Sequence, residues 1–400
     1  MGASWANVLL RSPPNRMSSY CICGKLMHVV GGVYQEVCLR PAWNALFGSG
    51  GRAAISLAAL SDKVVLHCYF EDASSLPLDS YRDHGIQLSL TRRDYGVAFA
   101  YFHPLSAPHL HPPAPIQHEP IQVRGEAVLR FGFIEGDAIV SAKRAVFDPQ
   151  GTKKTQDFFS NGSNAEQMAL VLNEAELNLR ASGATLIEAA REIIRRKQAN
   201  VVVIKRGIRG ATVVDEFERS FDVPSFRSPT VFKIGTGDVF SALFAFYWAE
   251  QGHEPQAAAC RASAGVAIYA STKRLPLRST AHDYNPVTGW PQGPVQVVGA
   301  RDTLGRHYVF EEAKHRLREL GVEIQGDLAT ARSERPSAIL IIADGLSPEA
   351  VQTIVASNKD IPVVLLDEVQ AAEGLENLHI ECTASDFTTA LYHAAWATMV

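Results

Sequence analysis

Short apolar runs rich in Val, Ile and Leu recur along the chain, and amphipathic segments with helical periodicity lie between them. The clearest runs are NVVVIKRG (200–207), AILIIADG (338–345) and IPVVLLDE (361–368). A continuous apolar run of this kind fits a strand that is buried on both faces, as in a parallel sheet covered by helices. The sequence therefore predicts an α/β fold with a mainly parallel central sheet.

Two such units are expected, with a polar segment rich in Pro and Gly between them. Residues 27–275 form the first unit, residues 276–294 the linker, and residues 295–400 a smaller Rossmann-like or flavodoxin-like layer. Residues 1–26 precede the first apolar strand and are expected to be an extension.

Residues 103–120 are dense in His and Pro, so we expect a surface loop or lid edge without regular structure.

Composition limits the classes of partner. Hydrophobic residues make up 46% of the 400 residues, charged residues make up 20%, and the formal net charge is −4. These values are ordinary for a globular protein and provide no basic field for nucleic acid or membrane. The six cysteines lack the paired spacing of a metal site. We expect a cytoplasmic protein, assembled as a homo-oligomer, whose partner is a small molecule.

The stretch FKIGTGDVFSALFAFYW (232–248) places a Gly-Thr-Gly turn and a carboxylate before an apolar helical run. Asp238 fits a helix N-cap, because Asp is favoured there. It also fits a catalytic base beside an anion site formed by the N–H groups of Gly235, Thr236 and Gly237 at the helix N-terminus. The pattern by itself favours capping.

Asn173 and Glu176 form an Asn-x-x-Glu pattern within an expected helix over residues 164–183. Positions i and i+3 share a helix face, so the amide and the carboxylate would project together. Such a pair can order Mg²⁺ through its water shell. A routine acidic helix surface produces the same pattern, and taken alone it is the favoured interpretation.

Lys205, Gly207 and Gly210 follow the apolar run at residues 200–204. This places them in a turn at the carboxyl edge of the sheet, where α/β proteins bind ligands. A plain connection between two strands would look similar.

In combination these motifs resemble the ribokinase-like (PfkB-type) carbohydrate and nucleoside kinases, over about residues 27–275. The Gly-x-Gly-Asp end of that family's second signature matches Gly235, Gly237 and Asp238. Its Asn-x-x-Glu motif matches Asn173 and Glu176, its Lys-x-Gly-x-x-Gly turn matches Lys205, Gly207 and Gly210, and its Asp-Pro strand end matches Asp148 and Pro149. Its Gly-rich substrate signature is echoed by GSGGRAAISLAAL, with Gly48, Gly50, Gly51 and Arg52.

The resemblance implies a ribokinase-like sandwich with a small β lid and ATP-dependent phosphorylation of a substrate hydroxyl. Asp238 would be the base, with the N–H groups of residues 235–237 as the anion hole. Lys205, Gly207, Gly210 and Asn173 would contact ATP, and Glu176 and Asn173 would hold Mg²⁺ through water. Glu36 and the Gly48–Arg52 segment would bind the substrate.

The chain departs from that family at several positions. Phe232-Lys233 replaces the leading Asp-Thr, Glu36 replaces a sugar-gripping Asp, and Ile55 stands where an Asn closes the substrate signature. Arg52 follows the two glycines, and Arg binds phosphate bidentately. A phosphorylated sugar or nucleotide is therefore one expectation, and a structural ion pair of Arg52 is the other.

Residues 295–400 more weakly resemble nucleoside 2-deoxyribosyltransferases. Gly299-Ala300 stands where Gly-Pro is expected, Asp344 lies in the Asp-Gly loop, and Gln352 stands about where the nucleophilic Glu belongs. An amide cannot be that covalent nucleophile. We expect a degenerate domain that binds a nucleoside or nucleotide at Gly299, Asp344 and Gln352, or mediates assembly.

The expected function is that of an ATP-dependent phosphotransferase acting on an alcohol group of a sugar, nucleoside or nucleotide. A non-catalytic nucleotide sensor or scaffold, of a regulatory or defence system, is the alternative. A glycosidic-bond enzyme that uses the C-terminal domain is a second alternative.

Overall fold

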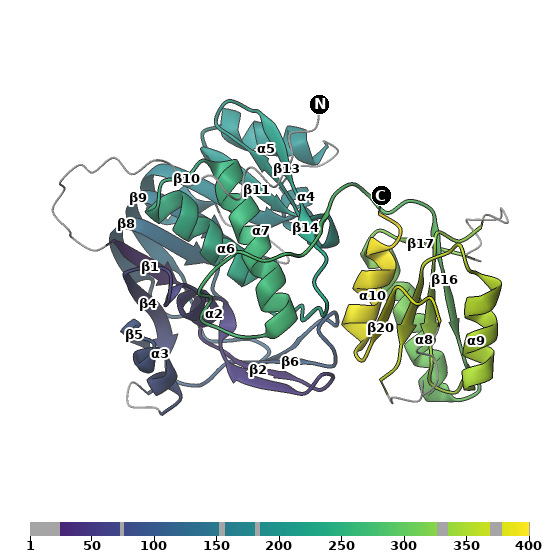
Figure 1. Ribbon diagram of the computed structural model, residues 1–400. Helices are drawn as coiled ribbons and strands as arrows, with labels where there is room; N and C mark the ends of the chain where they lie inside the picture. Colours follow the sequence, from purple (N-terminus) through teal and green to yellow (C-terminus); the bar gives the residue numbers. More distant parts are fainter. Residues whose placement is uncertain are drawn as a thin grey trace.

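The computed structural model describes residues 25–72, 76–151, 157–180, 185–325, 335–368 and 378–399. Residues 1–24 of the expected extension lie outside the described residues. Figure 1 shows a larger α/β unit that carries β1 and a smaller one that carries β16, with α10 of the smaller unit facing the larger.

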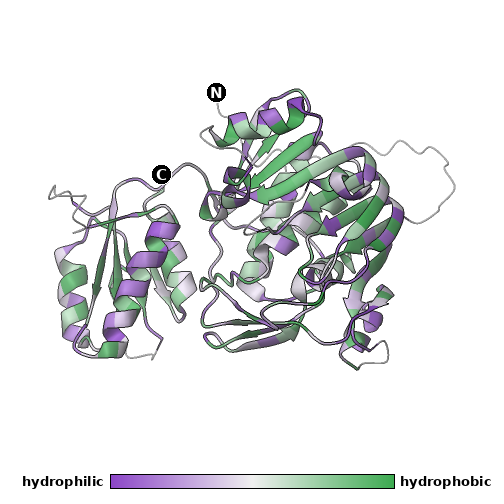
Figure 2. Cartoon of the chain, turned by 180° about the vertical axis from the view of Figure 1, so that it is seen from behind, coloured by the Kyte–Doolittle hydropathy of each residue, from purple (hydrophilic) through white to green (hydrophobic). Residues whose placement is uncertain are grey.

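The larger unit is built on a mainly parallel sheet. Its strands, in spatial order, are β13 (Ser220–Val223), β12 (Ala211–Val214), β11 (Val201–Lys205), β10 (Asn164–Asn173), β9 (Ala138–Asp148), β8 (Ile121–Phe131), β1 (Leu26–Val30), β4 (Lys63–Phe70) and β5 (Gln87–Arg92). Neighbours from β11 to β5 pair in parallel, whereas β12 and β13 pair antiparallel. Figure 2 shows that the strands are mainly hydrophobic. The predicted fold class is confirmed.

A small second sheet accompanies the large one and agrees with the expected lid. Its order is β3 (Trp43–Leu46), β2 (Gln35–Cys38), β6 (Ala98–Tyr101) and β7 (His109–His111). Strand β7 lies inside the segment 103–120, which we predicted to be wholly irregular. That prediction is wrong for these three residues, because β7 pairs antiparallel with β6.

Three helices bring the N- and C-terminal parts of the larger unit together. Helix α6 (Thr236–Ala245), which continues into a π-helical turn (Phe246–Glu250), packs against α2 (Gly48–Leu57) and α7 (Pro255–Thr272). Helix α6 is apolar on nearly all sides, as expected of a helix that other elements surround. The other helices are α5 (Leu186–Arg195) and the shorter α3 (Asp79–Asp83) and α4 (Glu174–Asn178). Among the described helices, none is both long and apolar enough to cross a membrane.

Residues 164–180, the described part of the predicted helix 164–183, do not form that helix. Asn164–Asn173 form β10, which pairs with β9 on one side and β11 on the other, and only Glu174–Asn178 are helical. The run from Met168 to Leu172 is buried between these neighbours. Burial in the middle of the sheet outweighs the helix propensity of the Ala, Glu and Leu residues in this stretch.

Asn173 and Glu176 consequently do not project from one helix face, as we predicted, but lie at the start of α4. Asn173 is the N-cap of α4, and its Oδ1 accepts a hydrogen bond from the Glu176 N–H at 2.8 Å. The Glu176 carboxylate accepts one from the Asn173 N–H, also at 2.8 Å. This is a capping box, so the two residues satisfy each other's backbone instead of sharing a helix face.

The smaller unit is a parallel sheet with helices, as predicted. Its strand order is β17 (Glu323–Ile324), β16 (Pro294–Gly299), β18 (Ala338–Ile342), β19 (Val363–Leu366) and β20 (Cys382–Ala384). Its helices are α8 (Leu304–Glu319), α9 (Pro348–Ser357) and α10 (Phe387–Trp396).

Helix α10 packs against the larger unit. Hydrogen bonds across this contact include Trp396 Nε1 to Ile208 O at 3.2 Å, His393 Nε2 with Ser228 O at 3.0 Å, Val231 N to Thr389 Oγ1 at 2.9 Å and Arg227 Nη2 to Trp396 O at 3.0 Å. The expected linker also packs on the larger unit, since Leu277 is buried and β15 (Pro286–Val287) pairs with β14 (Ser225–Phe226). The domain boundaries stay a prediction.

The capping box leads to a stability prediction. Replacing Asn173 with Ala leaves the first turn of α4 without its side-chain acceptor, and we expect unfolding free energy to fall by about 1 kcal/mol. Urea denaturation followed by circular dichroism measures this. Asn178→Ala, at the exposed end of the same helix, is the control; an equal loss there would contradict the capping role.

Candidate active site

The Gly-Thr-Gly turn forms the start of α6. Gly235 is the N-cap residue, with φ +75°, a left-handed conformation that Gly adopts without strain. No side chain caps this helix, so the capping interpretation of Asp238 is wrong. Asp238 lies instead in the first turn, where a carboxylate interacts favourably with the helix dipole and its side chain remains available for other contacts.

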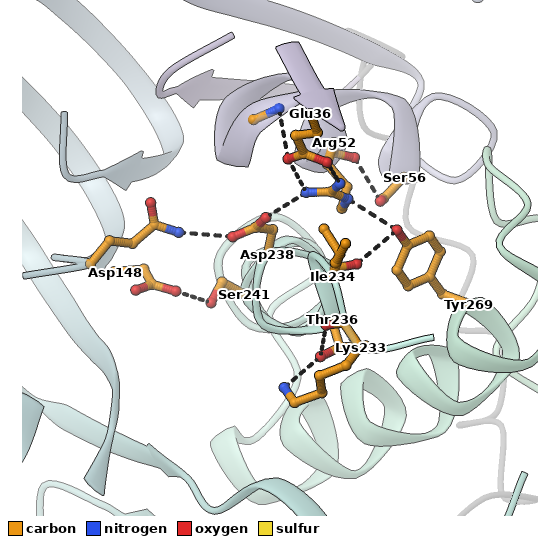
Figure 3. A network of polar contacts seen from close by, with 12 residues as sticks. Glu36, Arg52, Ser56, Asp148, Lys233, Ile234, Thr236, Asp238, Ser241 and Tyr269 are labelled. Carbon is orange, nitrogen blue, oxygen red and sulfur yellow. Dashed lines mark hydrogen bonds and ion pairs between the residues drawn. The ribbon is translucent and has the colours of Figure 1, made fainter. Parts of the chain in front are cut away.

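Arg52 stands at the centre of a buried network of charged groups, shown in Figure 3. Its Nη1 donates to Glu36 Oε1 at 3.0 Å and to Asp238 Oδ2 at 2.9 Å. Its Nη2 donates to the other Glu36 oxygen, and its Nε donates to the Tyr269 hydroxyl at 3.1 Å. The side chain is only 1% exposed. One guanidinium thus joins β2, α2, α6 and α7.

The charges in this network stabilise one another. Burial lowers the pKa of Arg52, but Glu36, Tyr269 and Asp238 outweigh that effect and hold it well above its usual value. Burial raises the pKa of the Asp238 carboxyl, and Arg52 opposes this rise. The contacts support the structural ion pair that we considered for Arg52, because a substrate phosphate would have to compete with Glu36 for the same donors.

The second oxygen of Asp238 lies on the accessible side. Its Oδ1 accepts a hydrogen bond from Gln150 Nε2 at 2.8 Å, and Gln150 is exposed. An exposed amide is far easier to displace than the buried guanidinium on the other oxygen. A ligand hydroxyl can therefore reach Asp238 at Oδ1.

A second charged cluster lies at the carboxyl ends of β9, β10 and β11. Lys205 Nζ donates to Asp148 Oδ2 at 2.5 Å, and the Ser241 hydroxyl donates to the same oxygen at 2.7 Å. Asn173 lies opposite Lys205 in the register of β10 and β11. Burial lowers the pKa of Lys205, but Asp148, Glu176 and Asp238 outweigh it, so the pKa is raised and this lysine is charged at neutral pH.

This cluster offers carboxylate oxygens for a hydrated cation. Asp148 Oδ1 is buried without a hydrogen-bond partner, and Glu176 is buried with its pKa raised by desolvation, which Lys205 opposes. Within the described ranges, no group of three His, Cys, Asp or Glu side chains is placed to bind a metal directly. The residues present fit a magnesium ion held through water, because Mg²⁺ keeps several waters and needs few protein ligands.

A cavity of about 110 Å³ adjoins the second cluster at Lys205 and the start of α6 at Thr236 and Gly237. Its polar end is lined by the predicted residues Lys205, Gly207, Gly210, Thr236 and Gly237, together with Lys233. Lys233 Nζ donates to Thr236 Oγ1 at 2.8 Å. Burial lowers the pKa of Lys233 to about 8, with Lys205 adding to the effect. The other end is lined by apolar side chains and by Tyr392 and Trp396 of α10.

The glycines of the expected substrate signature have mainly a packing role. The Gly48 N–H donates to Glu36 Oε1 at 3.2 Å. A Cβ on Gly50 would lie 2.5 Å from the Gly31 backbone, and one on Gly51 would lie 2.3 Å from the Tyr81 hydroxyl. These glycines let α2 approach the turn after β1, which brings Arg52 to Glu36.

The candidate residues of the smaller unit are only partly brought together. Gly299 ends β16, and Asp344 follows the neighbouring strand β18. Asp344 is paired with Arg306, whose Nε lies 3.2 Å from its Oδ2, and a Cβ on Gly345 would meet that guanidinium at 2.5 Å. Gln352 lies exposed on α9. Arg306 thus pairs with a carboxylate at which we expected a ligand, although Asp344 remains half exposed.

Sequence reasoning missed several residues of the site. In the sequence, Asp148 stands out only as part of a strand end, and Lys233 only as a departure from the family's Asp-Thr. Gln150 and Tyr269 carried no local signal, because each reaches the site from a distant part of the chain, and the contact of Ser241 with Asp148 spans 93 positions. Tyr392 and Trp396 were not considered, since they come from the other unit.

Comparisons with known proteins give matches among solved structures. Ribokinase from Thermotoga maritima is 18% identical, with 64% of this chain and 97% of that chain covered and a TM-score of 0.46. An aminoimidazole riboside kinase from Salmonella enterica, complexed with aminoimidazole riboside and an ATP analog, is 14% identical, with coverages of 62% and 94% and a TM-score of 0.47. A pyrophosphate-dependent kinase in the ribokinase family is 18% identical, with coverages of 61% and 93% and a TM-score of 0.42.

No protein-family model matches the chain, and no curated protein does. The structural matches are to ribokinase-family kinases, but their identities and TM-scores are too low to transfer a function.

The Arg52 network leads to a prediction about stability. Arg52→Ala leaves two buried carboxylates without their cation, and we expect a loss of about 3–5 kcal/mol in unfolding free energy. Arg196→Ala is the control, because this exposed Arg pairs with the exposed Glu192 of α5, and its loss should be below about 1 kcal/mol. Similar losses in urea denaturation of the two variants would show that Arg52 does not hold the site together.

Proposed function

We propose that this protein is an ATP-dependent phosphotransferase that phosphorylates an alcohol group of a sugar, nucleoside or nucleotide. The observation that carries the proposal is Asp238 in the first turn of α6, beside a Gly-rich N-terminus and two lysines that face one pocket. An anion held at this end of the helix lies next to a carboxylate that can take a proton. Phosphoryl transfer requires mainly such positioning and charge stabilisation.

In the proposed reaction, the acceptor hydroxyl replaces Gln150 at Asp238 Oδ1. Asp238 takes the hydroxyl proton as the oxygen bonds to the γ-phosphorus of ATP, whose bond to the bridging oxygen of ADP breaks. Arg52 holds the other oxygen of Asp238 and so fixes the orientation of the base. The N–H groups of residues 235–237, with Lys205 and Lys233, stabilise the negative charge on the transferring group.

Magnesium belongs to this proposal through the cluster at Asp148. Asn173 and Glu176, with the free oxygen of Asp148, would hold Mg²⁺ through its waters. When bound, the ion would neutralise part of the phosphate charge. The orphaned Asp148 oxygen supports this assignment, because a buried carboxylate oxygen needs a partner.

A non-catalytic nucleotide sensor is the second candidate, and one observation favours it. Both oxygens of Asp238 already have protein partners, Arg52 at 2.9 Å and Gln150 at 2.8 Å. If Gln150 keeps its place, the site binds a nucleotide without transferring phosphate. Incubating a panel of sugars, nucleosides and nucleotides with ATP and Mg²⁺, and weighing the products by mass spectrometry, separates the two candidates.

Nucleoside or nucleotide binding by the smaller unit stays a prediction. A ribose hydroxyl at Asp344 would have to replace the ion pair with Arg306. The glycosidic-bond alternative finds no support in the geometry, since Gln352 is an exposed amide.

The role of Asp238 is tested by Asp238→Asn. The amide keeps the shape but cannot accept the proton, so phosphate transfer should fall by about 10²–10⁴-fold while ATP affinity stays nearly unchanged. Asp222→Asn, at an exposed strand position, is the control. Turnover by Asp238→Asn at the rate of the unmodified protein would remove this residue from the mechanism.

The lowered pKa of Lys233 predicts a pH dependence of ATP binding. With a pKa of about 8, Lys233 is largely charged at pH 7 and largely neutral at pH 9. Affinity for the phosphates should therefore fall by about 3–10-fold between these values, as one charge-assisted hydrogen bond is lost. In Lys233→Arg the charge persists, so the fall should largely disappear in calorimetric titrations. The same fall in both proteins would assign the effect to another group.

A further inference from the structure

Helix α10 belongs to the smaller unit, yet two of its side chains line the cavity of the larger one. Tyr392 and Trp396 face the same space as Lys205 and Gly207. Figure 1 shows α10 on the side of its unit that faces the larger unit. Trp396 is held in place by its hydrogen bond to Ile208 O at 3.2 Å. Tyr392 and Trp396 thus complete the cavity, although they lie more than a hundred positions after its other lining residues.

The Tyr392 hydroxyl has no hydrogen-bond partner among the described residues. The side chain is 5% exposed, so water does not easily supply a partner. Three serines that line the same cavity differ, because their hydroxyls donate to backbone oxygens: Ser225 to Ile208, Ser228 to Thr230 and Ser263 to Pro224. A buried hydroxyl without a hydrogen-bond partner is unfavourable. This indicates that a ligand or an ordered water forms a hydrogen bond with the Tyr392 hydroxyl.

The two ends of the cavity differ in chemistry. Its lining includes the cationic Lys205 and Lys233 with the start of α6, and the apolar Phe226, Phe240 and Val266; we take the first group as a cationic end and the second as an apolar end. The space of about 110 Å³ is smaller than an apolar cavity of about 150 Å³ that holds one benzene, but the cavity is partly open, so a nucleotide can extend beyond it. An aromatic base cannot enter such a space without touching its walls, and α10 is one of them.

We propose that the Tyr392 hydroxyl forms a hydrogen bond with the nucleobase of the phosphate donor, so that the smaller unit completes the donor site and selects its base. This rests on the proposed function, which places the donor phosphates at the cationic end. The base then lies in the apolar end, where one polar group among apolar walls fixes its orientation. Tyr392 acts on binding and does not touch the transferring phosphate.

The test compares ATP with inorganic tripolyphosphate, which has the phosphates but no base, by calorimetry on the full chain. The unmodified protein should bind ATP more than about tenfold more tightly than tripolyphosphate. Tyr392→Phe should weaken ATP binding by about 3–10-fold and leave tripolyphosphate affinity unchanged. Tyr247→Phe is the control, because this buried hydroxyl pairs with Thr280 and does not line the cavity.

The outcomes separate the two proposals. If tripolyphosphate binds and Tyr392→Phe does not alter ATP affinity, the donor site stands and base recognition by Tyr392 is refuted. An equal loss of affinity for both ligands also overturns base recognition, because it shows a structural effect of Tyr392. If neither ligand binds the unmodified protein, the donor site itself is wrong, and the role of Tyr392 falls with it. Thermal unfolding of each variant confirms that the fold is kept.

Discussion

The ion pairs of Arg52 are the interaction on which the site depends. A buried guanidinium between Glu36 and Asp238 joins the small sheet, α2 and α6 at one point. Its planar fork reaches both carboxylates and Tyr269, which the single ammonium of Lys could not do with the same geometry. Since a buried charge without a partner is strongly unfavourable, the three elements hold one arrangement, and Asp238 is presented with one oxygen fixed and the other accessible.

The two lysines that line the cavity differ in how far a neighbouring group compensates their charge. Lys205 is paired with Asp148 and stays charged, whereas Lys233 has only a hydroxyl partner and titrates near pH 8. An anion that binds at the start of α6 therefore contacts two different cations. The charge of Lys205 is already partly compensated by Asp148, whereas Lys233 donates to a neutral hydroxyl. Lys233 can gain more from the anion, because Asp238 offsets its desolvation only in part and its pKa stays lowered.

Part of this site could be read from the sequence because its residues lie in short local motifs. Gly235, Thr236 and Gly237 do form a helix N-terminus, and Lys205 does follow a buried strand. The error at residues 164–183 came from a stretch whose composition suits a helix but whose place between two strands is decided elsewhere. The same error hid the capping box, which explains the spacing of Asn173 and Glu176 without reference to a ligand.

The sequence by itself determined the α/β class, the two units and the Gly-rich turn at α6, because these follow from local periodicity and backbone freedom. Only the tertiary structure decided that Arg52 pairs with Asp238, that Asp148 faces Lys205, and that Tyr392 lines the cavity. Each of these contacts joins residues far apart in the chain, between 57 positions for Lys205 and Asp148 and 186 for Arg52 and Asp238. Such contacts depend on how the elements pack, and no local pattern of residues encodes that.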